Sequence, residues 1–333
     1  EEFVIEESTL VRSLWDAVEV PGLQPPYNTA HLRIYYAATN PHTLEVDMSG
    51  IMPAAASTPA PVVIFLGGVN IGQDSLRWLM VELVKAGYVA VTFDLVGEQM
   101  PGFYRTTPGL DLGALKAGVY GTRPPSIAIQ PILDRLSELN REGTLAGTLD
   151  LDRIVLGGHS GGGTVALECA RTSYFPSLRA VVTYAAHTVP AAVLGHPEGT
   201  VLEAASDVPA LVMLGTEDGT MKRSISRYPG KDAGWNPVIQ TFEEGIPAGR
   251  DDAWLVVWEG ANHFGMGYPL DPTCARGFLD ADPTMDAELT RTDMTRVIVD
   301  FLNCYVRDDS SAESSLQQLQ SNPPLTVKEV RRR

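Results

Sequence analysis

Three side chains have the types and the order needed for an activated nucleophile. Ser160 lies in the pattern Gly-His-Ser-Gly-Gly at residues 158–162, between a largely apolar run at 153–156 and a helix-forming stretch at 164–170. In such a strand–turn–helix setting, Gly-x-Ser-x-Gly predicts a sharp turn that presents the serine, because the neighbouring positions lack side chains. A serine hydroxyl needs a histidine base that an acid orients. The motif therefore requires an acid and then a histidine further along the chain.

Both groups follow apolar segments that are typical of buried strands. An acidic pair, Glu217 and Asp218, follows residues 210–214, and His263 follows residues 254–258. Active sites of open α/β sheets lie at the carboxyl ends of the strands, so we expect Ser160, one of these acids and His263 to meet there. The short motif alone arises by chance in a chain with 31 glycines, and a lone histidine is often a surface residue. Motif, acid and histidine in this order favour catalysis.

Acyl transfer also needs two backbone N–H groups that bind the developing oxyanion. One is expected at Gly161, directly after the nucleophile and at the start of a helix, where the dipole favours negative charge. The other should come from the loop after the first central strand, residues 62–66. A glycine pair follows that strand and permits close backbone approach, so the N–H of Val69 is the candidate. The alternative is an ordinary Gly-Gly turn.

Composition limits the class of protein. The chain has 333 residues, of which 44% are hydrophobic and 20% charged, which is ordinary for a globular enzyme. A formal net charge of −16 argues against nucleic-acid partners, because phosphate binding needs basic surfaces. No segment is long and apolar enough to span a bilayer, and the acidic start has no signal-peptide core. We expect a soluble cytoplasmic protein, or a secreted one if a leader was removed, with at most transient contact with a membrane surface.

The three cysteines do not form a metal-binding pattern. Cys169 falls in the helix after the serine motif, where a small buried hydrophobic side chain is expected. Cys274 and Cys304 either bridge or stay free, and free thiols are favoured. Without a Cys-x-x-Cys pair or a Cys/His cluster, no metal site is expected, and the chemistry above needs no cofactor.

The order of the elements predicts an α/β fold with a mostly parallel central sheet and helices on both faces. Apolar segments alternate with helical patterns from residue 62 onward. Strands are expected at residues 62–66, 88–94, 154–156, 180–184, 210–214 and 254–258, and helices at 74–86, 127–140, 164–170 and 290–306.

The periphery divides into an extension, insertions and a tail. Residues 1–30 are expected to be an N-terminal extension containing a helix at 3–18, followed by an edge hairpin of strands 31–38 and 44–48. The catalytic domain would span residues 31–307. The Ser- and Gln-rich end, residues 308–333, is expected to be a flexible tail.

Two insertions, near residues 97–125 and 219–253, are long enough to be lids or binding loops. Both carry aromatic side chains, and we select Phe103, Tyr104 and Trp235 as candidate substrate-binding residues for a hydrophobic group. Nearly as well supported is the alternative that these side chains only pack the loops onto the body of the protein.

Four motifs together resemble the α/β-hydrolase superfamily over about residues 30–306. They are Phe-Leu-Gly-Gly at 65–68, the serine motif at 158–162, Gly-x-x-Asp ending at Asp218, and Asn-His-Phe around His263. The family's Gly-x-x-Asp spacing implies that Asp218 is the orienting acid and that Glu217 is a solvated charge. Within the superfamily the chain resembles a branch of dienelactone hydrolases, platelet-activating-factor acetylhydrolases, chlorophyllases and cutinase-like polyester hydrolases.

The resemblance implies a serine carboxylic-ester hydrolase whose partner is a small hydrophobic ester. Dienelactone hydrolases carry a cysteine where this chain has Ser160, which disfavours their activity. Chlorophyllases share the Gly-His-Ser-x-Gly-Gly motif, although they usually have His-Gly where this chain has Gly-Gly at 67–68. A chlorophyllase-like activity is therefore the most specific expectation. The alternatives are a generic carboxylesterase, lipase or polyester hydrolase, then a thioesterase or acyltransferase, and last a non-catalytic binding homologue.

Overall fold

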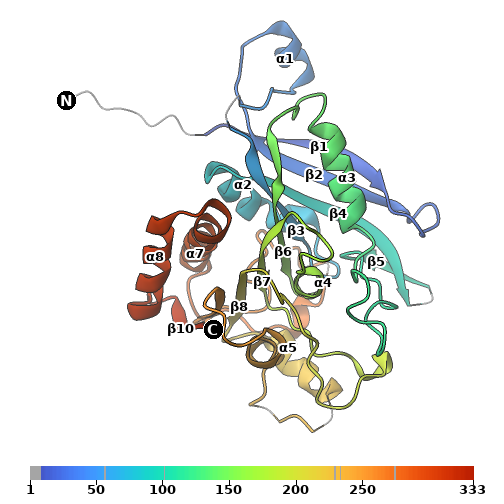
Figure 1. Ribbon diagram of the computed structural model, residues 1–333, viewed down its shortest axis with the longest axis vertical. Coiled ribbons are helices and arrows are strands. Elements are labelled where there is room, and N and C mark those ends of the chain that lie inside the picture. The colour runs from blue at the N-terminus through green and yellow to red at the C-terminus, as the bar shows by residue number, and fades with distance from the viewer. Residues whose placement is uncertain (1–8, 56–57, 101, 229, 233, 274) are drawn as a thin grey trace.

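The computed structural model describes residues 9–333 except 56–57, 101, 229, 233 and 274. In the described residues one mixed sheet runs in the spatial order β1-β2-β4-β3-β6-β7-β8-β9-β10, and β5 pairs with β4 (Figure 1). The six strands from β4 to β9 in this order are parallel, whereas β1, β2, β5 and β10 pair antiparallel. The strands are β1 (Val11–Glu19), β2 (Thr29–Ala37), β3 (Ala60–Leu66), β4 (Val89–Met100), β5 (Phe103–Thr106), β6 (Leu149–His159), β7 (Leu178–Tyr184), β8 (Ala210–Gly215), β9 (Ala253–Trp258) and β10 (Val327–Arg332).

Helices cover both faces of the sheet. Helices α2 and α7 lie on one face, with α8 packed on α7, and α3 and α4 lie on the other (Figure 1). The helices are α1 (Leu44–Ser49), α2 (Arg77–Lys85), α3 (Ile129–Leu139), α4 (Gly161–Cys169), α5 (Gly219–Ser224), α6 (Pro237–Gln240), α7 (Ala287–Arg307) and α8 (Ser310–Ser321), with short helical turns η1 (Gln73–Leu76), η2 (Ala192–Leu194), η3 (Ile225–Arg227), η4 (Thr241–Gly245) and η5 (Gly277–Leu279).

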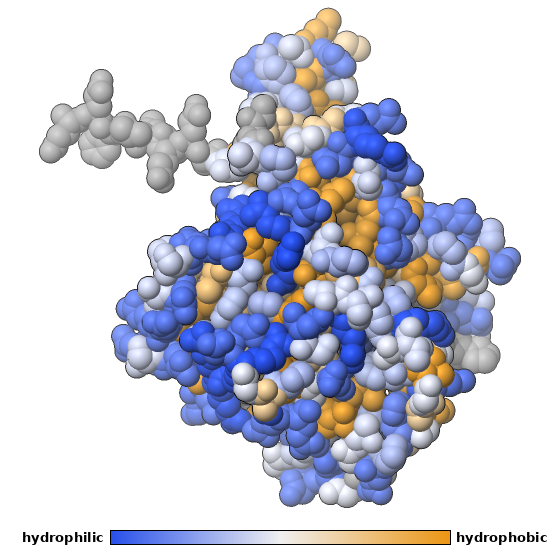
Figure 2. All heavy atoms as spheres, viewed as in Figure 1, coloured by the Kyte–Doolittle hydropathy of each residue, from blue (hydrophilic) through white to orange (hydrophobic). Residues whose placement is uncertain are grey.

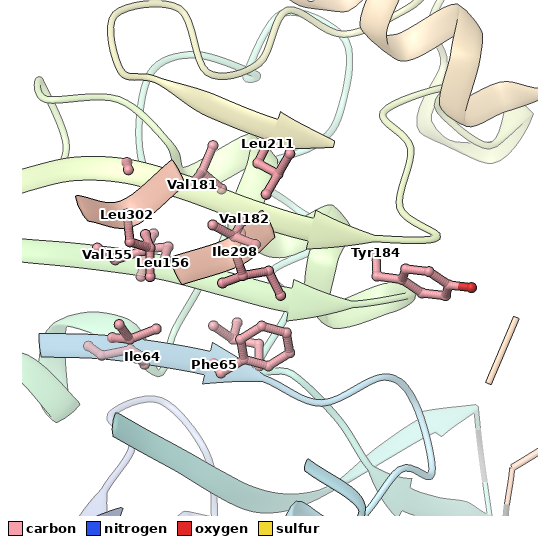
Figure 3. Packing of buried hydrophobic residues seen from close by; sticks show 14 of the residues in the cluster. Ile64, Phe65, Val155, Leu156, Val181, Val182, Tyr184, Leu211, Ile298 and Leu302 are labelled. Atoms are coloured by element: carbon pink, nitrogen blue, oxygen red, sulfur yellow. The ribbon is translucent and has the colours of Figure 1, made fainter. Parts of the chain in front are cut away.

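The central strands are apolar because both of their faces are covered. Every residue of β8 and β9 is buried. Figure 3 shows side chains of β3, β6 and β7 packed together, with Ile298 and Leu302 of α7 over them. The predicted central strands and helices, and the α/β fold class, are confirmed.

Two predictions for the N-terminal region are wrong. Residues 11–19 form β1 instead of a helix, because an alternating segment can pair with β2 along its whole length. Residues 3–8 lie outside the described part of the chain. Residues 44–48 belong to helix α1 instead of a strand, since the Thr43 side chain caps the first turn and Gly50, at φ +69°, ends it. The hairpin is therefore β1–β2, and β1 is part of the sheet.

The prediction of a flexible tail from residue 308 is also wrong. Asp309 caps α8, and the helix buries Ala312, Leu316 and Leu319 among its polar residues. The strand β10 then pairs antiparallel with β9 at the edge of the sheet. Apolar residues at helical spacing outweighed the Ser/Gln-rich composition.

The surface is polar over most of the face seen in Figure 2, and apolar residues show at the protruding α1 region, in a larger area below it toward the centre, and in smaller patches elsewhere. Leu44, Met48 and Ile51 are exposed in the α1 region. Within the described ranges, no helix combines the length and the apolar character needed to cross a membrane. Cys169 and Cys304 are free thiols, as favoured above, and Cys274 lies outside the described residues.

Candidate active site

Ser160 occupies a strained turn between β6 and α4. Its backbone has φ +53° and ψ −125°, a conformation that costs a non-glycine residue about 1–3 kcal/mol. The glycines around it make the turn possible. A Cβ on Gly158 would lie 2.5 Å from the backbone of Gly162, and a Cβ on Gly162 would lie 2.3 Å from the carbonyl oxygen of Leu66. The turn therefore presents the serine hydroxyl at the carboxyl edge of the sheet.

A hydrogen-bonded relay joins Ser160, His263 and Asp218. The Oγ of Ser160 is 2.9 Å from Nε2 of His263, and Nδ1 of His263 is 2.9 Å from Oδ2 of Asp218. The carboxylate is acceptor only, so Nδ1 carries the proton and Nε2 is free to accept the serine proton. The Asp218 and His263 side chains are each only 3% exposed. The structure thus brings together the three residues selected from the sequence.

Asp218, and not Glu217, contacts His263. Asp218 precedes α5, and its Oδ1 accepts a 2.7 Å hydrogen bond from the backbone N–H of Met221, which fixes the carboxylate. Glu217 instead pairs with Lys222 at 3.4 Å, and its side chain is one-third exposed. The geometry agrees with the choice that the Gly-x-x-Asp spacing implied.

Three further side chains hold the loop that carries His263. Nε2 of His159 lies 2.8 Å from the carbonyl oxygen of His263, and the hydroxyl of Tyr184 donates a 2.6 Å hydrogen bond to the carbonyl of Asn262. Oδ2 of Asp280 accepts a 3.2 Å hydrogen bond from the N–H of Phe264. His263 is therefore anchored through its own carbonyl and through both neighbouring residues.

Burial shifts the pKa values of two of these supporting groups. Desolvation, with a smaller contribution from His263, lowers the pKa of His159 to about 3, so this imidazole is neutral. Desolvation followed by the nearby charge of Asp218 raises the pKa of the Asp280 carboxyl. Our sequence reasoning missed both residues. His159 stood inside the serine motif and was a detectable signal, whereas nothing local marks Asp280.

The two proposed oxyanion donors lie next to each other. A Cβ built on Gly161 would be 3.8 Å from the backbone nitrogen of Val69 and 3.3 Å from its Cγ2. A Cβ on Gly68 would be 3.1 Å from Cβ of Ser160, so a side chain here would crowd Ser160. In the described part of the chain, neither the Val69 nor the Gly161 N–H donates to a protein acceptor. Both remain available to a ligand.

The three proposed substrate-binding residues differ in how they are connected to the relay of Ser160, His263 and Asp218. Phe103 and Tyr104 on β5 are 62% and 48% exposed, and Tyr104 stacks on Tyr27 with ring centroids 4.4 Å apart. No described contact joins either residue to the relay. The strand β5 does approach the oxyanion loop, because the N–H of Asn70 donates to the carbonyl of Thr106.

Trp235 is linked to the site through two other rings. It packs on Tyr228 with centroids 5.0 Å apart, and Tyr228 packs edge-on against His187, whose ring centroid is 5.8 Å away. His187 lies in the loop after β7, and its pKa is lowered to about 4 by burial, with Asp218 raising it and His263 lowering it. His187 is therefore close enough to the relay to respond to its charges.

Across the described residues, no set of three or more His, Cys, Asp or Glu side chains forms a candidate metal site. The model of the alpha/beta hydrolase family matches residues 63–329. No curated protein matches the chain.

Proposed function

The chain belongs to the alpha/beta hydrolase family, and on this premise we propose that it hydrolyses carboxylic esters through a covalent acyl-enzyme. The observation that carries the proposal is the relay of two 2.9 Å hydrogen bonds from Ser160 through His263 to Asp218. Such a relay turns a weak hydroxyl nucleophile into one that can attack a carbonyl.

In the first step, Nε2 of His263 accepts the proton of Ser160 as Oγ attacks the ester carbonyl. The N–H groups of Val69 and Gly161 bind the oxyanion that forms on the carbonyl oxygen. His263 then gives its proton to the ester oxygen, the alcohol leaves, and an acyl-serine remains. Asp218 keeps the proton on Nδ1 and stabilises the imidazolium that forms between the two transfers.

In the second step, His263 takes a proton from water, and the hydroxide attacks the acyl-serine carbonyl. The same two N–H groups bind the second oxyanion. His263 returns the proton to Oγ of Ser160 as the acid leaves. The loop contacts of His159, Tyr184 and Asp280 keep the imidazole in place through both steps.

The substrate we propose is an ester with a hydrophobic portion. The rings of His187, Tyr228 and Trp235 form a continuous aromatic path away from the relay. Phe103 and Tyr104 would extend the apolar surface from the other insertion. A chlorophyllase-like reaction, which releases a long-chain alcohol from a large hydrophobic acid, is the most specific form of this proposal. A generic carboxylesterase, lipase or cutinase-like polyester hydrolase is the alternative.

Two other functions use the same residues differently. A thioesterase or acyltransferase would employ the same relay, and comparing acyl-thioesters with oxygen esters separates it from an esterase. A non-catalytic binding protein would keep the fold and show no turnover. An intact relay argues against that alternative.

The decisive experiment combines active-site labelling with turnover. A fluorophosphonate probe should label the wild-type protein, and Ser160→Ala should abolish both labelling and hydrolysis of a p-nitrophenyl ester series. Ser137→Ala, on the exposed side of α3, is the matched control and should behave as wild type. Labelling of the Ser160→Ala variant at one probe per chain would overturn the nucleophile assignment. Adding a chlorophyll and an acyl-thioester to the series ranks the substrate alternatives.

A further inference from the structure

Four arginines gather beside the proposed active site although the chain is strongly acidic. Arg223, Arg227 and Arg276 line a cavity of about 380 Å³, and Arg105 on β5 is near enough for its charge to act on Arg276. They come from three separate segments: β5, the α5–η3 region and the loop after His263. Because the net charge of the chain is −16, its composition gives no reason to expect several arginines without acidic partners at one place.

None of these four guanidinium groups has an ion pair or hydrogen bond within the described part of the chain. Other arginines are paired. Arg135 contacts Asp16 at 2.9 Å, and Arg250 contacts Asp252 at 2.8 Å. The pKa of Arg276 is lowered by burial first and then by the positive charges of Arg227 and Arg105. Arg276 is therefore repelled by Arg227 and Arg105, and a bound anion would relieve that repulsion.

Hydroxyl groups complete the lining of the same cavity. Thr220, Ser224 and Ser226 lie among the arginines, but the hydroxyls of Ser224 and Ser226 already donate to the carbonyls of Met221 and Arg223, so Thr220 is the hydroxyl donor left for a ligand. Oγ1 of Thr220 is buried and has no hydrogen-bond partner among the described residues. Guanidinium and hydroxyl groups are the donors that recognise carboxylate and phosphate oxygens.

The cavity shares a wall with the relay. Oδ1 of Asp280 accepts hydrogen bonds from the N–H of Gly219 at 2.8 Å and of Thr220 at 3.4 Å, while Oδ2 holds the residue after His263. Gly219 directly follows Asp218, and Leu279 on the cavity wall precedes Asp280. A ligand in the cavity thus lies next to the segment that carries the orienting acid.

Arg105 extends the positive charge toward the oxyanion loop. The next residue, Thr106, accepts a 3.1 Å hydrogen bond from the N–H of Asn70, which follows Val69. The basic groups therefore lie near both the segment that carries Asp218 and the loop that carries the proposed oxyanion donor Val69.

We propose that this arginine cavity binds an oxyanion group, a carboxylate or a phosphate, carried by the ester substrate. The inference rests on the proposed esterase function and narrows it to esters that combine an apolar portion with an anionic group. An anion site argues against the chlorophyllase-like form of the proposed function, whose substrate would be a neutral pigment ester, and favours the carboxylesterase alternatives.

The test compares matched esters with and without a negative charge. The full-length protein is assayed with p-nitrophenyl butyrate and p-nitrophenyl hemisuccinate, and with a second pair whose carboxylate is on the aryl group. We expect a higher kcat/KM for the anionic member of at least one pair. Arg276→Gln and Arg227→Gln should each lower the ratio of anionic to neutral kcat/KM about tenfold, the scale of one charge-assisted hydrogen bond at a partly exposed site.

Arg179→Gln is the control, because Arg179 lies at the opposite end of β7 and contacts the carbonyl of Asp152. It should leave the ratio unchanged. Added inorganic phosphate should inhibit the anionic ester more than the neutral one and should raise the melting temperature of wild type more than that of Arg276→Gln.

The outcomes separate the two proposals. A ratio that Arg276→Gln and Arg227→Gln leave unchanged overturns the anion site, while turnover of neutral esters that depends on Ser160 still supports an esterase. If phosphate stabilises the protein through Arg276 but the esters show no charge preference, the cavity binds a free anion and the assignment to substrate is wrong. If ester turnover does not depend on Ser160, the proposed esterase function itself is wrong.

Discussion

His159 donates a 2.8 Å hydrogen bond from Nε2 to the backbone carbonyl of His263, so the residue before Ser160 holds the hydrogen-bond partner of Ser160 in place. The bond links the turn after β6 to the loop after β9 across the carboxyl edge of the sheet. A carbonyl oxygen only accepts, so the proton of His159 is on Nε2 and its buried Nδ1 is bare. The hydrogen bond from Nε2 of His159 therefore fixes the loop that carries His263 relative to Ser160.

Replacing His159 tests this positioning role. His159→Phe keeps a ring of similar size but removes the donor, so the His263 loop should shift and kcat should fall by up to about a hundredfold with little change in KM. His159→Gln retains a donor at similar reach and should recover much of the loss. Steady-state kinetics on one short ester, with melting temperatures of both variants, checks this. Equal kcat losses in both variants would mean that the residue only fills space.

Asp218 and Glu217 are adjacent in the chain but should respond very differently to loss of charge. In Asp218→Asn the amide oxygen should stay with the N–H of Met221, which leaves an NH₂ donor facing Nδ1 of His263 and favours the wrong tautomer, so kcat should fall by about 10⁴. Glu217→Gln removes only an exposed ion pair with Lys222 and should have little effect. Initial rates with a p-nitrophenyl ester measure both. The reverse ranking would transfer the orienting role to Glu217.

The sequence was sufficient to place Ser160, Asp218 and His263 at one edge of the sheet. Each follows a strand that is buried on both faces, and such strands are recognisable as short apolar runs bounded by turn residues. The topology then brings the strand ends together whatever the intervening loops do. Tertiary contacts such as Asp280 to Phe264 have no local signature, because the partners are joined only by the folded loop.

The peripheral segments were harder to predict, because their amino-acid composition and the spacing of their apolar residues indicate different structures. Residues 310–321 are rich in Ser and Gln, but Ala312, Leu316 and Leu319 recur on one face of the helix and become buried. Residues 11–19 fit an amphipathic helix or a strand, and only pairing with β2 decides between them. In both cases the packing partner in the folded protein, β2 for β1 and α7 for α8, decided the structure.

The ordered C-terminal segment should contribute measurably to stability. Leu316 of α8 is 1% exposed, so Leu316→Ala should lower the free energy of unfolding by about 2–5 kcal/mol. Leu325→Ala is the matched control, because Leu325 is 89% exposed and its loss should change stability by less than about 0.5 kcal/mol. Chemical denaturation of both variants makes the comparison. Identical denaturation midpoints for the two variants would contradict this and would favour a flexible tail at residues 308–333.

Trp235 offers the clearest test of a hydrophobic substrate. Trp235→Ala should weaken turnover of long-chain or pigment esters by about 1–3 kcal/mol of transition-state binding, because it removes one ring of the aromatic path. Acetate esters are too short to reach that surface and should be much less affected. Phe103→Ala and Tyr104→Ala test the other insertion in the same assay. Equal losses of kcat/KM for short and long esters would make these loops structural.

Glu168 on α4 should make the stability of the protein depend on pH. The residue is 2% exposed, its Oε2 has no partner among the described residues, and burial raises its pKa to about 8. In the unfolded chain the carboxyl ionises near its ordinary pKa of 4.5, so between pH 4.5 and 8 the folded state holds a proton that the unfolded state has lost. The contribution of Glu168 to the free energy of unfolding is therefore fully present below pH 4.5 and is lost as pH rises toward 8.

Glu168→Gln should remove this dependence while keeping the volume of the side chain. The free energy of unfolding of wild type should fall by up to about 1.4 kcal/mol per pH unit between pH 5 and 8 relative to the variant, which is the effect of one proton. The stability of the variant relative to wild type should consequently increase as pH rises. Melting temperatures from pH 5 to 9 measure the difference, and Glu142→Gln on the exposed surface should follow the wild-type curve. Parallel curves for Glu168→Gln and wild type would show that Glu168 is ionised in the folded protein, with a partner that neutralises the cost of its burial.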